Sequence, residues 1–181
     1  MDTKLKKIVD ALQEKFGTTH EEFRDEVHVF VKAENIVDAL TLLRDKHNFQ
    51  LLSAMTAVDY FPQMSPRFHV IYQLTSLGKN ALEQLTPLTE ILSVQLRVAV
   101  NGDQPKVPTA ARVYDVANWR ERELLDMFGI EFEGHPDPRR ILMPVEHEGH
   151  PLRKDYPLGY EEPQFTFNYD DIDLKKIYAK E

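Results

Sequence analysis

The chain contains no cysteine among its 181 residues. This absence excludes disulfide bonds, thiolate zinc sites, c-type haem attachment and cysteine-ligated iron–sulfur clusters held by this chain. The sequence also lacks a glycine-rich phosphate loop and the Gly-x-Ser-x-Gly elbow of serine hydrolases. If the protein takes part in redox chemistry, other chains must therefore hold the electron carriers.

Long apolar runs and basic stripes are absent as well. No segment approaches the ~20 apolar residues needed to cross a bilayer, and the Lys-rich, acidic start at residues 1–15 differs from a signal peptide. We therefore expect the protein to stay in the compartment where it is made. The formal net charge of −8 is spread along the chain, so nucleic acid and anionic lipid are poor candidate partners.

The N-terminal part shows the periodicity of a helix, a strand and a second helix. Apolar residues fall at helical spacing from Leu5 to Phe16, and Gly17 is expected to end this helix. Alternating valines at 27–31 predict a strand, and a second helix is predicted at about 34–46.

A run of strands is predicted in the middle of the chain. Residues 49–58 are apolar enough for a strand covered on both faces, and alternation predicts two more strands at 68–74 and 92–100. The segment 59–66 contains two prolines and is expected to be a loop. The stretch 77–90 allows one further helical segment. Helix–strand–helix followed by several strands indicates an α+β fold with a small mixed or antiparallel sheet.

A charged helix is predicted at 118–128. Asn118 is expected to be its N-cap, with Glu121 completing a capping-box spacing, and Arg122 and Asp126 are four residues apart and can pair across one turn. The apolar side is expected to consist of Trp119, Met127 and Phe128. This helix either meets another protein or is a surface helix with weak ion pairs of about 0.3–0.5 kcal/mol each, and spacing alone favours the second interpretation.

The loop after this helix combines stiff backbone with adjacent charges. Gly129 is expected to end the helix, and Gly134 can take a positive φ before a proline-rich stretch. Arg139 and Arg140 offer planar guanidiniums that suit carboxylates. They either dock against an acidic neighbour or brace the acids of this chain itself, which are Glu121, Glu123 and Asp126.

Three histidines in the same region allow a metal hypothesis. His135, His147 and His150 would be the ligands of a soluble metal-dependent hydrolase. Acidic residues accompany them at Asp137, Glu146 and Glu148. However, the chain has no local signature such as His-Glu-x-x-His, so this interpretation is only the alternative. His28 and His47 are expected to be solvent-facing polar residues without a function.

The last segment is unusually aromatic for a tail. Residues 158–181 carry tyrosines, phenylalanines and isoleucines among acids, which is too apolar a composition for simple disorder. The chain is therefore divided into a domain at 1–150 and an extended C-terminal arm at 151–181. This arm is expected to lie across a partner rather than to fold back over the domain.

An ordered series of motifs extends over forty residues of the charged stretch. It reads Asn118-Trp119-Arg120-Glu121-Arg122-Glu123, then Asp126-Met127-Phe128-Gly129-Ile130, Phe132-Glu133-Gly134-His135-Pro136-Asp137, Arg139-Arg140-Ile141-Leu142 and Gly149-His150-Pro151-Leu152-Arg153-Lys154-Asp155-Tyr156-Pro157. This series resembles the thirty-kilodalton subunit of the proton-pumping NADH–quinone oxidoreductase, respiratory complex I.

The resemblance implies a non-catalytic subunit of a hetero-oligomeric complex. Such a subunit packs against the subunit that forms the quinone site and against the iron–sulfur subunits, on the cytoplasmic side of the bacterial plasma membrane, and meets the membrane only through the complex. Flavin, iron–sulfur clusters and quinone belong to the partner subunits, and no cofactor, metal or catalytic residue is expected in this chain. The residues expected to brace or to form the interface are Glu121, Arg122, Glu123, Asp126, Gly129, Gly134, His135, Asp137, Arg139, Arg140, Arg153, Lys154, Asp155 and Tyr156.

Overall fold

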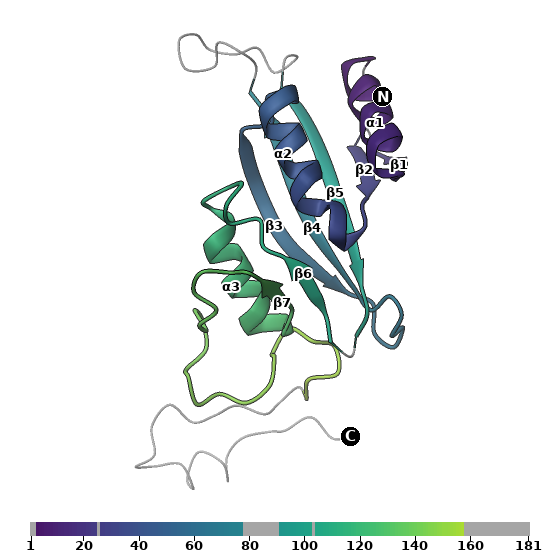
Figure 1. Ribbon diagram of the computed structural model, residues 1–181. Helices are drawn as coiled ribbons and strands as arrows, with labels where there is room; N and C mark the ends of the chain where they lie inside the picture. The colour runs from purple at the N-terminus through teal and green to yellow at the C-terminus, as the bar shows by residue number, and fades with distance from the viewer. Residues whose placement is uncertain (1–2, 25, 78–90, 103, 158–181) are drawn as a thin grey trace, which may run out of the picture.

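A five-stranded sheet with helices packed on it forms the body of the protein (Figure 1). The computed structural model describes residues 3–24, 26–77, 91–102 and 104–157. The elements follow one another as α1 (Thr3–Phe16), β1 (Thr19–Phe23), β2 (Glu26–Phe30), the 3-10 helix η1 (Ala33–Asn35), α2 (Ile36–His47), β3 (Leu51–Asp59), β4 (Phe68–Ser76), β5 (Leu92–Val100), β6 (Lys106–Pro108), α3 (Ala117–Phe128) and β7 (Glu131–Glu133). The α+β class predicted from the sequence is confirmed.

The large sheet is mixed, with strand order β1-β2-β5-β4-β3. The pairs β1–β2, β3–β4 and β4–β5 are antiparallel, whereas β2 and β5 run parallel. Strand β1 was not expected, because all five of its side chains are exposed and they carry no apolar alternation. It forms because the backbone of β2 offers it a free edge to pair with.

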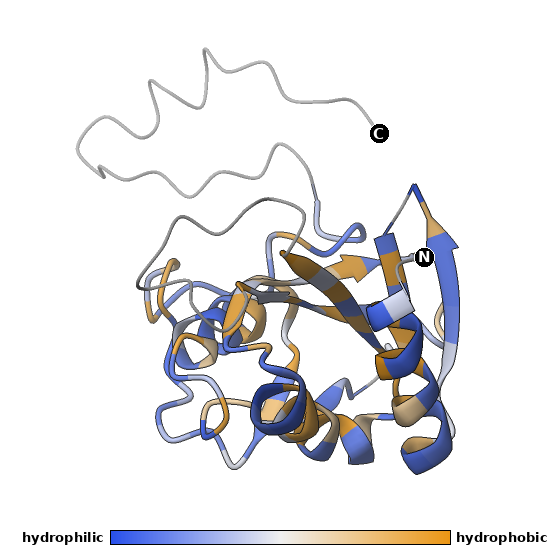
Figure 2. Cartoon of the chain, turned by 90° about the horizontal axis from the view of Figure 1, so that it is seen from above, coloured by the Kyte–Doolittle hydropathy of each residue, from blue (hydrophilic) through white to orange (hydrophobic). Residues whose placement is uncertain are grey.

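The core lies between the sheet and its helices. Figure 2 shows the helices on one side of the sheet, with apolar residues turned toward it. Helix α1 buries the stripe from Leu5 to Leu12, and α2 buries Leu40 and Leu43. Gly17, at φ +62°, donates its amide to the carbonyl of Gln13 and so ends α1 as predicted.

Two predictions about exposure in this region are wrong. The strand at 49–58 was expected to be covered on both faces, but Leu51, Ala54 and Thr56 of β3 are exposed. His28 was expected to face solvent, yet it is 4% exposed because β1 lies beside it and Glu21 contacts its ring at 3.4 Å. His47 is half-buried at the end of α2.

A second, two-stranded sheet holds α3 against the body. Strands β6 and β7 pair in parallel, and neither was expected because three residues are too few to show alternation. Helix α3 begins at Ala117 rather than at Asn118, and no side chain caps it. Asn118 is therefore not the N-cap. The predicted end at Gly129 is confirmed, with φ +68°.

A buried arginine joins the end of β3 to the C-terminal segment. The Arg67 guanidinium is 3% exposed and makes two hydrogen bonds to Asp59, at 3.0 and 2.9 Å, and two to Asp155, at 3.0 and 2.6 Å. The backbone amide of Lys154 also donates to Asp59, at 2.9 Å. Residues 151–157, predicted as the start of an arm, thus lie against the domain. The remainder of that arm, 158–181, and most of the segment 77–90 lie outside the described residues, so the boundary at 150 stays a prediction.

None of the helices in the described ranges is both long enough and apolar enough to span a bilayer. The architecture therefore directs attention to α3 and to the loop that follows it, where the structure places nearly all of the residues singled out from the sequence.

The Arg67 cluster should make stability depend on acid. Burial alone would raise the pKa of Asp59, but hydrogen bonds from Arg67 and from two backbone amides outweigh it and lower the pKa from 3.8 to about 2. The stabilisation is therefore present above pH ~4 and is lost as the pH falls toward 2. Between pH 6 and pH 2 we expect the unfolding free energy of the protein to fall by on the order of 2 kcal/mol more than that of Asp59→Asn.

Urea unfolding of both proteins across this pH range measures the difference. The exposed substitution Asp10→Asn on α1 is the control, and it should follow the unsubstituted protein. Parallel curves for the unsubstituted protein and Asp59→Asn would show that Asp59 is not held ionised by Arg67.

Candidate functional site

Asp126 organises the loop that follows α3. This carboxylate is 1% exposed, and its Oδ2 accepts the consecutive backbone amides of Ile141, Leu142 and Met143 at 3.0, 2.8 and 2.9 Å. Its Oδ1 accepts a bond from Arg140 at 2.6 Å. Burial alone would raise the pKa of Asp126, but these four hydrogen bonds lower it. The loop is consequently fixed to the helix by one ionised side chain.

The predicted pair between Arg122 and Asp126 is not formed. Arg122 instead donates to the carbonyls of Arg139 and Arg140, at 3.0 and 3.1 Å, and lies 3.7 Å from Asp137. The physical reason is that Asp126 finds three amides and Arg140 in the loop, which satisfy a buried carboxylate better than one exposed neighbour. Arg122 thus braces the same loop from its other side.

The adjacent arginines, Arg139 and Arg140, have different roles. Arg140 braces the internal acid Asp126, which is one of the two alternatives that the sequence left open. The side chain of Arg139 is 79% exposed and pairs with Asp137 at 2.6 and 2.7 Å. Only Arg139 therefore presents its guanidinium to the surroundings.

Glu121 is the most deeply buried acid of the region. It is fully buried and accepts bonds from the Thr109 hydroxyl at 2.5 Å and from the Ala110 amide at 2.6 Å. Burial raises the pKa of Glu121 to about 7, although the two hydrogen bonds oppose this shift. The predicted capping box is therefore wrong, and Glu121 joins α3 to the segment that follows β6. Glu123 lies on the exposed side and pairs with Arg120 at 3.3 Å.

The three histidines proposed as metal ligands have separate partners. His135 contacts the carbonyl of Asn118 through Nε2, at 3.0 Å, and accepts the amide of Asp137 at Nδ1, which places its proton on Nε2. His150 donates to the carbonyl of Asp126 at 2.9 Å, and His147 lies 3.3 Å from the Tyr156 hydroxyl. Across the part of the chain that the structure describes, no three His, Asp or Glu side chains are arranged to hold a metal ion. The hydrolase alternative therefore has no support.

Gly129 is required where the C-terminal segment crosses the end of α3. A Cβ atom at this position would collide with the ring of His150 and would lie 2.6 Å from the guanidinium of Arg153. Arg153 donates to the carbonyl of Phe128 at 2.6 Å, and the amide of Leu152 donates to the carbonyl of Met127. The segment thereby satisfies carbonyls that every helix end leaves without partners. Gly134 takes the predicted positive φ, +80°.

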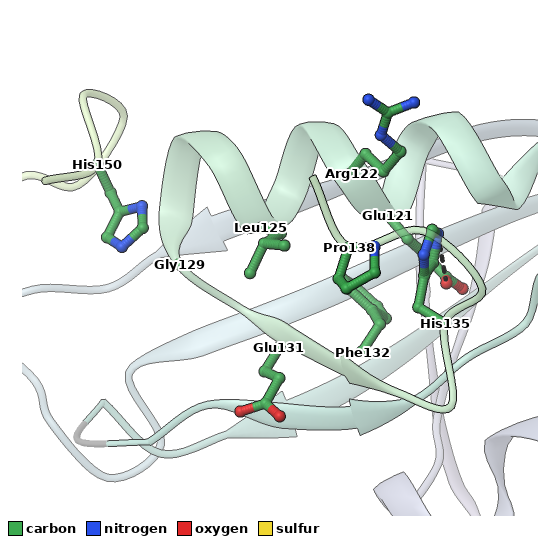
Figure 3. A pocket seen from close by; sticks show the side chains of 9 residues that line it. All are labelled: Glu121, Arg122, Leu125, Gly129, Glu131, Phe132, His135, Pro138 and His150. Carbon is green, nitrogen blue, oxygen red and sulfur yellow. Dashed lines mark ion pairs between the residues drawn. The ribbon is translucent and has the colours of Figure 1, made fainter. Parts of the chain in front are cut away.

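A pocket of about 360 Å³ lies between α3, β7 and this loop (Figure 3). Its lining residues are Glu121, Arg122, Leu125, Gly129, Glu131, Phe132, His135, Pro138 and His150. Figure 3 shows Glu121 and His135 pointing toward each other, 3.7 Å apart. Both already have other hydrogen-bond partners, and the lining includes no serine, threonine, cysteine or lysine nucleophile. The pocket is therefore a poor candidate for an active site.

Large apolar side chains are exposed on the framework that these bonds hold. This exposed apolar set consists of Trp119, Leu142, Val145 and Leu152, which are 70%, 61%, 87% and 52% exposed. Trp119 was expected on the apolar side of α3, but only Met127 and Phe128 are buried there. The set was missed as a site because the sequence was searched for charge, although Trp119 begins the motif series.

Comparison with known proteins identifies relatives over most of the chain. A family model described as "Respiratory-chain NADH dehydrogenase, 30 Kd subunit" matches residues 29–162. A protein of Roseiflexus sp. that is named as a subunit of NADH-quinone oxidoreductase is 45% identical, covering 88% of this chain and 86% of its own. A protein of the same name from Trichlorobacter lovleyi is 43% identical, with coverages of 84% and 89%.

Two solved structures share the fold. The trypsin-resistant fragment (1-134) of Nqo5 is 29% identical with a TM-score of 0.62, and the match covers 75% of this chain and 99% of the fragment. A chain of the membrane-bound sulfane sulfur reductase, an archaeal respiratory membrane complex, has a TM-score of 0.69 with coverages of 98% and 95%. At 23% identity this second match shows the fold alone.

The raised pKa of Glu121 predicts a loss of stability with rising pH. Because the folded pKa of about 7 exceeds the usual 4.5, the stabilisation is present below pH 4.5 and is lost as the pH passes 7. Between pH 5 and pH 8 the unfolding free energy should fall by on the order of 2 kcal/mol relative to that of Glu121→Gln. Denaturant titrations of both proteins test this, and equal slopes against pH would contradict it.

The two adjacent arginines predict opposite outcomes for matched substitutions. Arg140→Met leaves the buried Asp126 carboxylate without its cation and should cost about 1–3 kcal/mol of unfolding free energy. Arg139→Met removes only an exposed pair and should stay within about 0.5 kcal/mol. Urea unfolding at neutral pH compares the two variants. The reverse ranking would mean that Asp126 does not depend on Arg140.

Proposed function

The chain belongs to the family of the 30 kDa subunit of the respiratory-chain NADH dehydrogenase, and on this premise we propose that it is a non-catalytic subunit of the peripheral arm of NADH–quinone oxidoreductase. In this role it braces the quinone-site subunit and the neighbouring iron–sulfur subunits. Those partners pass electrons from NADH to quinone, coupled to proton translocation. The relatives from Roseiflexus and Trichlorobacter are both named as a subunit of this enzyme.

One observation carries this proposal, namely the division of labour within the charged stretch. Asp126, Arg122 and Arg140 are used to hold the loop to α3. The exposed apolar set is what the stretch presents outward. Contiguous apolar side chains on a surface mark protein interfaces, and tryptophan is enriched among the residues that dominate binding.

The rigidity of the loop also favours an interface. Three consecutive amides are bound to Asp126, so the backbone that carries Leu142 is already ordered before a partner arrives. An ordered surface loses little conformational entropy on binding. An apolar recess of a partner protein, with an acidic rim for Arg139, would complement this surface.

The cofactors of the reaction are assigned to the partners. This chain has no cysteine to ligate an iron–sulfur cluster, and none of the pocket residues forms a phosphate-binding glycine loop. Flavin, clusters and quinone would belong to other subunits. We place the protein on the cytoplasmic side of the bacterial plasma membrane, held there through the complex. Residues 158–181 are proposed to extend onto a partner.

Affinity purification from gently solubilised membranes of the native host tests the proposal. The tagged, unsubstituted protein should recover flavin and iron–sulfur subunits together with NADH-dependent quinone reduction. The double variant Trp119→Ser/Val145→Ser should recover at least tenfold less of them, because the exposed apolar set is removed. Its unfolding free energy should change by less than about 1 kcal/mol, since both side chains are exposed.

Phe23→Ser is the matched control, because Phe23 is 58% exposed on β1, at one edge of the large sheet. This variant should recover the subunits fully. If the unsubstituted protein comes down alone, the proposed function is wrong. If the double variant retains its partners, the interface lies elsewhere.

A further inference from the structure

The two edges of the large sheet differ in how they meet solvent. Strand β1 closes one edge with five residues, including Glu21 and Glu22. Strand β3 forms the other edge with nine residues and has no charged side chain and no proline before Asp59. Proteins normally protect an edge by keeping it short or by placing charge or proline on it. The β1 edge is protected in this way, whereas β3 has only a register shift between Leu52 and Ala54.

The outer side of β3 is well ordered but unpaired. In the described part of the chain, backbone pairing of residues 51–58 is with β4 alone. The amide of Tyr60 donates to the carbonyl of Arg67, so alternation along the ladder directs the amides of Met55 and Ala57 away from β4. The flanking residues are anchored, since Tyr114 donates to the carbonyl of Phe49 at 2.6 Å and Asp59 is bound by Arg67.

The composition of β3 agrees with a strand that is covered. Its apolar run predicted cover on both faces, yet Leu51 is 43% exposed, and Ala54 and Thr56 are exposed as well. The described residues of this chain do not supply the second cover. The missing cover therefore has to come from outside the described fold.

A groove of about 750 Å³ adjoins the first residues of β3. It is lined by residues of α2, the start of β3 and the segment 112–116. Val116 is 48% exposed beside it, and Arg112 is exposed and makes no ion pair with any described residue. The groove thus offers an apolar contact and an available positive charge next to an unpaired strand edge.

We propose that the β3 edge and this groove bind an extended segment of a neighbouring subunit, which adds to the sheet as a further strand. The proposal rests on the proposed function, because it takes its occupant from the same complex. Main-chain hydrogen bonds to β3 would hold the segment, and alternate side chains would enter the groove. An acidic side chain of that segment would meet Arg112, which gives the site its charge preference.

Hydrogen exchange compares the isolated full-length protein with the complex purified from its host. The amides of Met55 and Ala57 should exchange readily in the isolated protein and at least tenfold more slowly in the complex. Equal exchange in both states would overturn the proposal. Slow exchange already in the isolated protein would overturn it too, because the edge would then be covered by this chain itself.

A charge added at the edge tests the same site by another route. Ala54→Lys/Thr56→Lys places two ammonium groups on exposed positions of β3, where natural edge strands use lysine against strand addition. We expect at least tenfold lower recovery of partner subunits from host membranes. Ala99→Lys, an exposed position on the internal strand β5, is the control and should recover them fully.

The outcomes separate this inference from the proposed function. If the unsubstituted protein recovers no subunits, the proposed function fails. If it recovers them and the double lysine variant does so equally, only the strand addition fails. Should the lysine variant unfold, the exchange of Met55 and Ala57 in the unsubstituted protein decides the question.

Discussion

The buried carboxylate of Asp126 is the constraint on which the charged stretch depends. An ionised group that is 1% exposed needs hydrogen bonds on nearly every lone pair, and the loop supplies three consecutive amides and Arg140. The loop can satisfy Asp126 only in the one conformation that brings these four donors together. The fold thereby converts a costly buried charge into a rigid surface.

The Arg67 cluster does the same at the other end of the segment. There the buried charge is a cation, placed between Asp59 and Asp155 and stacked near Phe61 and Phe68 at 5.1 and 4.9 Å. Asp126 and Arg67 together fix both sides of residues 140–155. What remains for contact with other molecules is mostly apolar, which is the composition of a protein–protein interface rather than of a catalytic centre.

Local patterns in the sequence were sufficient for the elements but not for the partners of the charged residues. The stripe from Leu5 to Leu12 and the end at Gly129 depend on neighbours within a few residues, and both were predicted. The bonds of Asp126 and Glu121 reach segments eleven or more residues away, which spacing within one helix does not reveal. The short strands β6 and β7 were missed for a related reason, since each exists only because the other pairs with it. The family resemblance indicated which residues matter, and the structure shows what several of them contact.

The spacing of the Arg67 cluster along the chain has a consequence for biosynthesis. Asp59 and Arg67 are eight residues apart and meet within one hairpin, whereas Asp155 lies 88 residues beyond Arg67. A chain emerging from the ribosome can therefore complete the hairpin pair early, but the second carboxylate arrives only after α3 and its loop have been made. Nascent or prematurely terminated chains that end before Asp155 carry a guanidinium with half of its partners. Completion of this cluster is thus a chemical mark of a chain long enough to be assembled.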